Sequence, residues 1–92
     1  FIFIPNAFTP NGDGDNDYFK PYAPPALITS MYFAVFDRWG EIIYESTNIN
    51  DQGWDGTYRG KLLAPDVYVY FFEATCLNQD TYNQKGNVTL IR

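Results

Sequence analysis

The chain has 92 residues, of which 46% are apolar and 20% aromatic, so it can form one small domain with a dense core. Six basic against eleven acidic residues give a net charge of −5, which disfavours binding to nucleic acids and to anionic lipid surfaces. The absence of histidine excludes catalytic triads and zinc sites that need imidazole, and a single cysteine cannot form an internal disulfide.

The first part of the chain predicts short strands separated by turns. Residues 1–4 are apolar and end at Pro5, as in an edge strand or a first strand. Residues 9–17 are rich in Pro, Asn, Gly and Asp, which indicates turns, and residues 18–22 predict another short strand. Residues 28–36 are the first candidate for a long strand.

The rest of the chain continues this pattern. The expected elements are a hairpin turn at 37–40, a strand at 41–45, a turn at 59–61, a strand at 67–76, a polar connection at 77–84 and a last strand at 86–92. Apolar residues do not recur at helical spacing over three turns, so helices are not expected. Short strands at this spacing predict an all-β sandwich.

An acidic loop is the one place where the spacing suggests a ligand. Asn11, Asp13, Asp15 and Asp17 alternate with glycine and with Asn16, so their oxygen atoms can converge on a hard cation such as calcium. The pattern departs from an EF-hand, which needs glycine where Asn16 stands. The alternative is a turn-rich loop whose Asn and Asp side chains accept hydrogen bonds from nearby backbone N–H groups.

Other polar and aromatic residues have both structural and functional interpretations. Trp39 and Trp54 have the chemistry to stack on sugar rings, but we expect each to close one end of the core. Asp37, Glu41 and Asp55 offer the residue type from which a glycoside hydrolase takes its pair of catalytic carboxylates. All three are expected in turns or at strand ends, where carboxylates are ordinarily solvated.

Two further residues are predicted to have a structural role. Tyr68 opens a long strand after Pro65 and Asp66, which is the position of a tyrosine corner in a β-sandwich. Cys76 is expected to be a small buried hydrophobic residue.

Five blocks of sequence, in order along the chain, resemble one known family, the gliding-motility-associated C-terminal domain. These blocks are Pro5 to Gly14 followed by Asn16 and Asp17, Phe36 to Glu41, Trp54 to Tyr58 followed by Gly60 and Lys61, Val67 to Tyr70, and Lys85 to Arg92. Asp37 departs from the family pattern, which usually has Asn there, and Asp66 replaces a common Gly. The resemblance runs from Pro5 to Arg92.

The family comprises the type B C-terminal sorting domains of the type IX secretion system of Bacteroidota. The resemblance implies an immunoglobulin-like antiparallel β-sandwich of about seven strands. It also implies a non-catalytic secretion signal at the C-terminus of a larger secreted or surface protein, which the signal directs through the periplasm and across the outer membrane. The sequence lacks an initiator Met and a basic signal-peptide region, so we expect residues 1–92 to be a single domain cut from such a protein.

The resemblance implies that the partners are proteins of the type IX machinery. The isolated domain is expected to be a monomer, and no cofactor is expected to be required apart from an optional structural calcium ion in the acidic loop. No apolar run approaches the roughly 18–20 residues of a transmembrane helix, so no transmembrane segment is expected.

The end of the chain is the expected contact with the machinery, through addition of a strand at a sheet edge. Its candidate recognition residues are Lys85, Gly86, Val88, Thr89, Leu90, Ile91 and Arg92. The alternative function is an accessory binding module, either stabilised by calcium or binding carbohydrate. A hydrolase that uses paired carboxylates ranks last.

Overall fold

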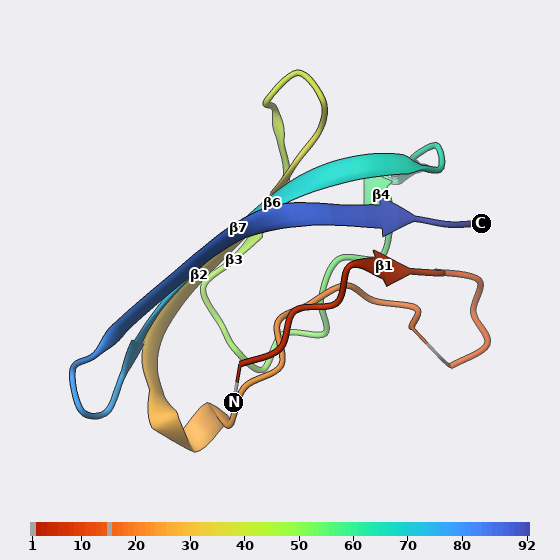
Figure 1. Ribbon diagram of the computed structural model, residues 1–92. Helices are drawn as coiled ribbons and strands as arrows, with labels where there is room; N and C mark the ends of the chain where they lie inside the picture. The colour runs from red at the N-terminus through yellow and green to blue at the C-terminus, as the bar shows by residue number, and fades with distance from the viewer. Residues whose placement is uncertain (1, 15) are drawn as a thin grey trace.

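The computed structural model describes residues 2–14 and 16–92 (Figure 1). Within these residues the elements are β1 (Ala7–Phe8), a 3₁₀ helix η1 (Pro25–Leu27), β2 (Ile28–Phe36), β3 (Ile42–Ser46), β4 (Thr57–Tyr58), β5 (Lys61–Leu62), β6 (Asp66–Cys76) and β7 (Thr81–Leu90). The predicted all-β class with about seven strands is confirmed. None of the described helical segments has the length and apolar character to cross a membrane.

Five of the strands form one sheet in the order β1-β7-β6-β2-β3. The pairs β2–β3, β2–β6 and β6–β7 are antiparallel, as expected for a sandwich. The pair β1–β7 is parallel, with Ala7 opposite Thr89 and Phe8 opposite Leu90, so the sheet is mixed. This parallel pair places residues 7–8 beside the C-terminal end of β7 at one edge of the sheet (Figure 1).

A layer of short and irregular segments covers the inner face of this sheet. β4 and β5 form a small hairpin, and two isolated antiparallel bridges join Phe3 to Tyr22 and Phe19 to Trp54. The strand expected at 18–22 is therefore reduced to single bridges. The strand expected at 1–4 is likewise reduced to the bridge at Phe3, and Phe1 lies outside the described residues.

The core lies between the sheet and this irregular layer. Alternate residues of the long strands point inward, in accordance with the two-residue repeat of a β-strand. The buried hydrophobic residues are Phe8, Phe19, Met31, Phe33, Ala34, Val35, Ile43, Trp54, Tyr68, Tyr70, Phe72, Ala74, Val88 and Leu90. The rings pack at tilted or edge-on angles, as the 5.5 Å between the centroids of Phe19 and Tyr70 illustrates.

β7 is longer at its start than the sequence pattern indicated. The polar connection expected at 77–84 is wrong for residues 81–84, which pair with β6. Polar side chains at 81 and 83 point to solvent, whereas the ring of Tyr82 packs against Phe72 at 6.1 Å between centroids. Because only the inward positions of a strand with one solvent-exposed face need to be apolar, hydropathy alone does not identify such a strand.

The two tryptophans have opposite environments. Trp54 is 1% exposed, and its indole N–H donates a 2.9 Å hydrogen bond to the carbonyl oxygen of Thr57, so the prediction that it closes the core is confirmed. The same prediction is wrong for Trp39, which is 82% exposed. The carboxylate of Asp37 accepts the N–H groups of Trp39 and Glu41, and this closed turn holds the indole away from the sheet.

The tyrosine corner is present. The hydroxyl of Tyr68 donates a 2.7 Å hydrogen bond to the carbonyl oxygen of Ala64, four residues upstream. Burial and the nearby carboxylate of Asp66 raise the pKa of Tyr68 above its usual value of 10.0. Cys76 is half-buried, somewhat more accessible than expected.

The first prediction compares the two tryptophans. Trp54→Ala removes a buried ring from the centre of the core, so the free energy of unfolding should fall by about 3–5 kcal/mol. Trp39→Ala serves as the matched control and should change it by no more than about 0.5 kcal/mol, because that ring is exposed. Urea unfolding monitored by circular dichroism measures both. Similar losses in the two variants would contradict the assignment of the core.

Candidate functional site

The acidic loop is organised by one carboxylate. Oδ1 of Asp17 accepts the N–H groups of Asn11 at 3.1 Å and Gly12 at 3.0 Å, and Oδ2 accepts that of Gly14 at 2.8 Å. Gly12 and Gly14 have φ angles of 80° and 86°, which turn these N–H groups inward. A 2.8 Å bond from the N–H of Thr9 to the carbonyl oxygen of Asn16 closes the loop.

This arrangement changes the acidity of Asp17. The N–H of Gly14 contributes most to holding the pKa of Asp17 below its ordinary value of 3.8, against partial desolvation, with help from the N–H groups of Gly12 and Asn11. Asn11 makes a similar local bond, since its Oδ1 accepts the N–H of Asp13 at 3.2 Å. Asn11 and Asp17 therefore act as the turn-forming side chains of the alternative interpretation.

The calcium interpretation of this loop stays a prediction. Asp15, one of its four expected ligands, lies outside the described residues. Among the residues that are described, no group of three or more acidic, Cys or His side chains is arranged to hold a metal ion.

The candidate recognition segment, Lys85 to Arg92, is mostly built into the fold. Val88 and Leu90 are buried in the core. Thr89 donates its N–H to the carbonyl oxygen of Asn6 at 2.9 Å, through which the segment pairs with β1. Gly86 packs under a core ring, because a Cβ atom there would lie 2.7 Å from the hydroxyl oxygen of Tyr70.

The last residue is also anchored. The guanidinium of Arg92 donates to the carbonyl oxygens of Leu63 at 2.9 Å and Gly56 at 3.0 Å, which ties the end of the described chain to the β4–β5 hairpin. Lys85, Ile91 and Arg92 are exposed, and the exposed fraction of Ile91 is 46%. Of the expected recognition residues, these three are accessible to a partner.

The carboxylates considered for hydrolysis stabilise turns. Asp37 accepts two backbone N–H groups in the β2–β3 turn. Oδ1 of Asp55 accepts the N–H of Thr57 at 3.0 Å and its hydroxyl at 2.7 Å. Glu41 accepts the hydroxyl of Tyr58 at 3.2 Å. These bonds account for each carboxylate without a substrate.

An exposed cluster that the sequence interpretation missed lies at the β2–β3 turn. The guanidinium of Arg38 lies 5.4 Å from the centroid of Trp39 and forms an ion pair with Asp66 at the start of β6. This hydrogen-bonded pair raises the pKa of Arg38 and lowers that of Asp66. The adjacent Arg38 and Trp39 in a predicted turn were the sequence signal for this cluster. Its third member, Asp66, is far away in the sequence, so the ion pair was not predictable.

The second prediction concerns Asp17. Asp17→Asn keeps one acceptor oxygen but replaces the other by an amide that cannot accept N–H bonds, so stability at about pH 7 should fall. Because the folded-state pKa of Asp17 is lowered, its contribution is complete above the unfolded value of 3.8 and is lost as pH falls through the folded value. The variant should therefore lose less stability on acidification than the wild type.

Urea unfolding at neutral pH and near pH 3 measures this difference. Glu73→Gln is the matched control, because this exposed carboxylate lies in the middle of β6. Equal acid sensitivity of the wild type and Asp17→Asn would exclude the role assigned to the carboxylate.

Comparison with known proteins places the chain in a family. A search of curated proteins finds no match. Among solved structures, CopC from Methylosinus trichosporium OB3b is similar with 19% identity and a TM-score of 0.47, over 79% of this chain and 70% of the CopC chain. At this identity and TM-score the likeness says nothing about what the chain binds.

One family model matches nearly the whole chain. The sequence model of the CHU_C type IX secretion signal domain matches residues 2–90. The matched range includes the acidic loop, the β2–β3 turn, the β4–β5 hairpin and both long strands at the end of the chain. The chain therefore belongs to the family of CHU_C type IX secretion signal domains.

Proposed function

We propose that this domain is a non-catalytic C-terminal signal that directs an attached cargo protein across the outer membrane through the type IX secretion system. The observation that carries the proposal is the family match over residues 2–90. The cargo would pass through the periplasm and reach the cell surface or the medium. The domain would act as a monomer recognised by proteins of the secretion machinery.

The arrangement of the side chains supports a passive role. The carboxylates Asp17, Asp37 and Asp55 accept hydrogen bonds within their own turns, and each bond stabilises local structure. The aromatic core and the anchored Arg92 give a small domain that keeps its shape while attached to another protein. A secretion signal needs a stable, recognisable surface and no reacting group.

One observation favours a second candidate, an accessory module that binds carbohydrate. Trp39 is exposed and the guanidinium of Arg38 lies over its ring, so an aromatic ring and a cation are presented together to a ligand. Trp54 does not share that surface, because it is buried. A single exposed ring is a weaker platform than a pair, so we rank this function second.

The third prediction tests export. A fusion of a signal peptide, a fluorescent reporter and this domain should leave the cells only when the type IX apparatus is intact. A strain that lacks the outer-membrane translocon controls for leakage, and a fusion that carries Trp54→Ala controls for folding. Reporter fluorescence in washed cells and in the medium gives the exported fraction. Periplasmic retention of the wild-type fusion in the intact strain would exclude the proposal.

The fourth prediction concerns calcium, which we propose as an optional structural ligand of the acidic loop. Since Asn11 and Asp17 already accept N–H bonds, an ion would use the lone pairs that these bonds leave free, together with Asp13 and Asp15. Millimolar calcium should raise the melting midpoint relative to chelator, and Asp13→Asn should reduce the increase. Asp80→Asn, in the β6–β7 turn, is the control. An unchanged midpoint removes calcium from the proposal.

A further inference from the structure

One side of β7 is open over most of its length. β6 pairs with β7 along its whole length, from Leu90 opposite Asp66 to Thr81 opposite Thr75, whereas β1 pairs with only Thr89 and Leu90 on the other side. Figure 1 shows β1 beside the C-terminal end of β7 alone. Within residues 2–14 and 16–92, no strand pairs with the outer side of residues 81–87.

The unpaired backbone groups can be assigned. In a strand, the N–H and C=O of alternate residues point to the same edge. Thr89 and Ile91 donate their N–H groups toward β1, to the carbonyl oxygens of Asn6 and Phe8. The other odd-numbered residues of β7 point the same way, which leaves an open edge formed by Thr81, Asn83, Lys85 and Asn87.

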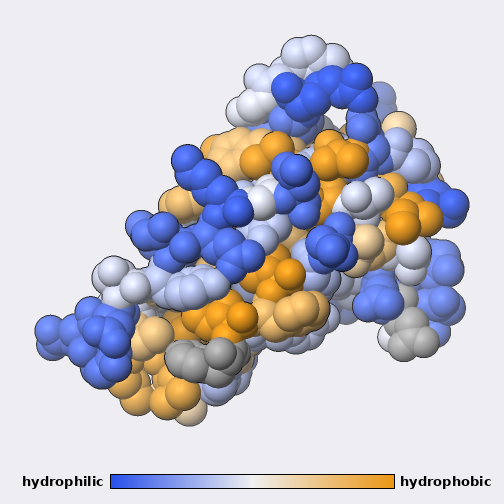
Figure 2. Space-filling view, in the orientation of Figure 1, coloured by the Kyte–Doolittle hydropathy of each residue, from blue (hydrophilic) through white to orange (hydrophobic). Residues whose placement is uncertain are grey.

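This edge lacks the usual protection against added strands. Proteins commonly block an open edge with proline, a bulge or several charges. β7 contains no proline, its register with β6 is continuous over ten residues, and Lys85 is its only charged residue. Figure 2 shows apolar residues reaching the surface in small groups between polar ones on the face of the molecule that carries β7.

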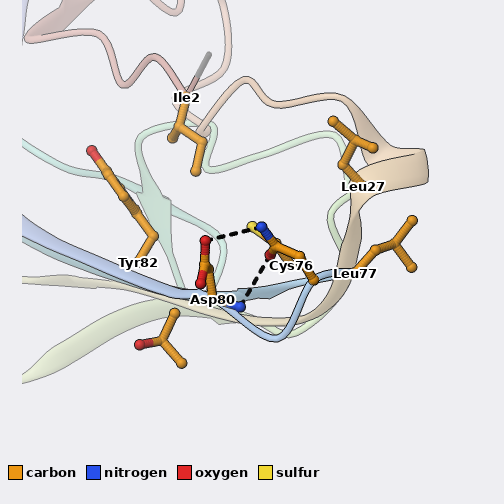
Figure 3. A pocket seen from close by; sticks show the side chains of 8 residues that line it. Ile2, Leu27, Cys76, Leu77, Asp80 and Tyr82 are labelled. Atoms are coloured by element: carbon orange, nitrogen blue, oxygen red, sulfur yellow. Dashed lines mark hydrogen bonds between the residues drawn. The ribbon is translucent and has the colours of Figure 1, made fainter.

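A pocket of about 590 Å³ lies at the start of this edge. Figure 3 shows Ile2 across the pocket from Cys76 and Asp80, with Tyr82 on one side and Leu27 and Leu77 on the other. The lining is mainly apolar, and the volume exceeds that of one large side chain. A residue beside Tyr82 on an added strand would point toward this pocket, because Tyr82 itself points to the inner face.

The charge of Lys85 indicates which kind of strand would pair with the open edge of β7. Lys85 has no ion-pair partner among the described residues, and it is exposed at the middle of the open edge. An acidic residue directly opposite Lys85 would form a favourable cross-strand pair. A second copy of this chain would instead bring a net charge of −5 and, in a two-fold antiparallel pair, a second Lys85 to the same stretch.

We propose that β7 binds an extended segment of a partner protein as an additional antiparallel strand. The segment carries an acidic residue opposite Lys85 and, three positions further along, an apolar residue opposite Tyr82 that enters the pocket. Strand addition of this kind takes its affinity from backbone hydrogen bonds and its specificity from the side-chain positions. That the partner belongs to the secretion machinery rests on the proposed function above; the binding mode does not.

This assignment moves the expected contact along the chain. The edge of Thr89 and Ile91 is already occupied by β1, and Val88 and Leu90 are buried. Lys85 is the one candidate recognition residue that belongs to both the expected segment and the open edge. The new contact therefore extends from Lys85 toward Thr81 and away from Arg92.

The fifth prediction is tested with a synthetic peptide, acetyl-Thr-Val-Asp-Ser-Thr-Leu-Thr-amide, titrated into the ¹⁵N-labelled domain. The amides of Thr81, Asn83, Lys85 and Asn87 should exchange rapidly in the free domain and become protected on binding. N-methylation of the peptide's Asp, or of the Thr between its Ser and Leu, should weaken binding by about tenfold or more, because the N–H groups of these two residues face β7. N-methylation of Ser and Leu, whose N–H groups face away, should leave binding nearly unchanged.

Charge reversal provides the second arm. Lys85→Glu should weaken binding of the peptide by roughly fivefold, and replacement of its Asp by Lys should restore binding to this variant. Lys61→Glu, on the distant β5, is the matched control and should bind as the wild type does. Replacement of the peptide's Leu by Asp should weaken binding to wild type and variants alike.

Three results would overturn the inference: no protection of the four edge amides at millimolar peptide, equal effects of the two sets of N-methylated peptides, or a dimer of the free domain by sedimentation. The test uses purified domain, so it is separate from export. A domain that exports its cargo but fails to bind the peptide overturns this inference alone, whereas one that binds the peptide but is not exported overturns the proposed function alone.

Discussion

The packing of Trp54 against the sheet is the interaction on which the rest of the domain depends. Its ring lies 5.3 Å from Phe8 of β1 and 5.2 Å from Tyr68 of β6, measured between centroids, and its backbone pairs with Phe19. The segments around Phe8, Phe19 and Trp54, which have little regular structure, are thereby held to β6 through one aromatic cluster. Because a 92-residue chain has little core to lose, an irregular layer is stable here only when large rings fill the space beneath it.

The excess of acidic residues has a structural use in the turns. Asp17, Asp37 and Asp55 each accept hydrogen bonds from neighbouring backbone N–H groups, and each of these turns contains a glycine with a positive φ angle. A carboxylate bonded in this way stabilises a turn more strongly than a neutral acceptor does. The net charge of −5 therefore partly reflects carboxylates that accept hydrogen bonds in turns.

The short β1 strand determines which part of the sheet is accessible. It covers the end of β7 with two residues and leaves the start of the strand open above the pocket. The same chain end is held by Arg92, which binds the carbonyl oxygens of Gly56 and Leu63. The anchored end and the open edge are thus adjacent parts of one strand, so the partner strand proposed above would bind the edge without opening the core.

The amino-acid sequence is enough to predict the all-β class, the long strands at 28–36 and 67–76, the turns and the family, because β-propensity, two-residue alternation and turn residues are local properties. It also predicts the tyrosine corner and the core position of Trp54. Three features became apparent only in the folded domain: Trp39 is exposed, residues 81–84 extend β7, and β1 runs parallel to β7. These three depend on which distant segment lies alongside. Folding brings Asp66 to Arg38, β6 to residues 81–84 and Asn6 to Thr89. Each of these partners is distant in the sequence, so no local pattern predicts the contact.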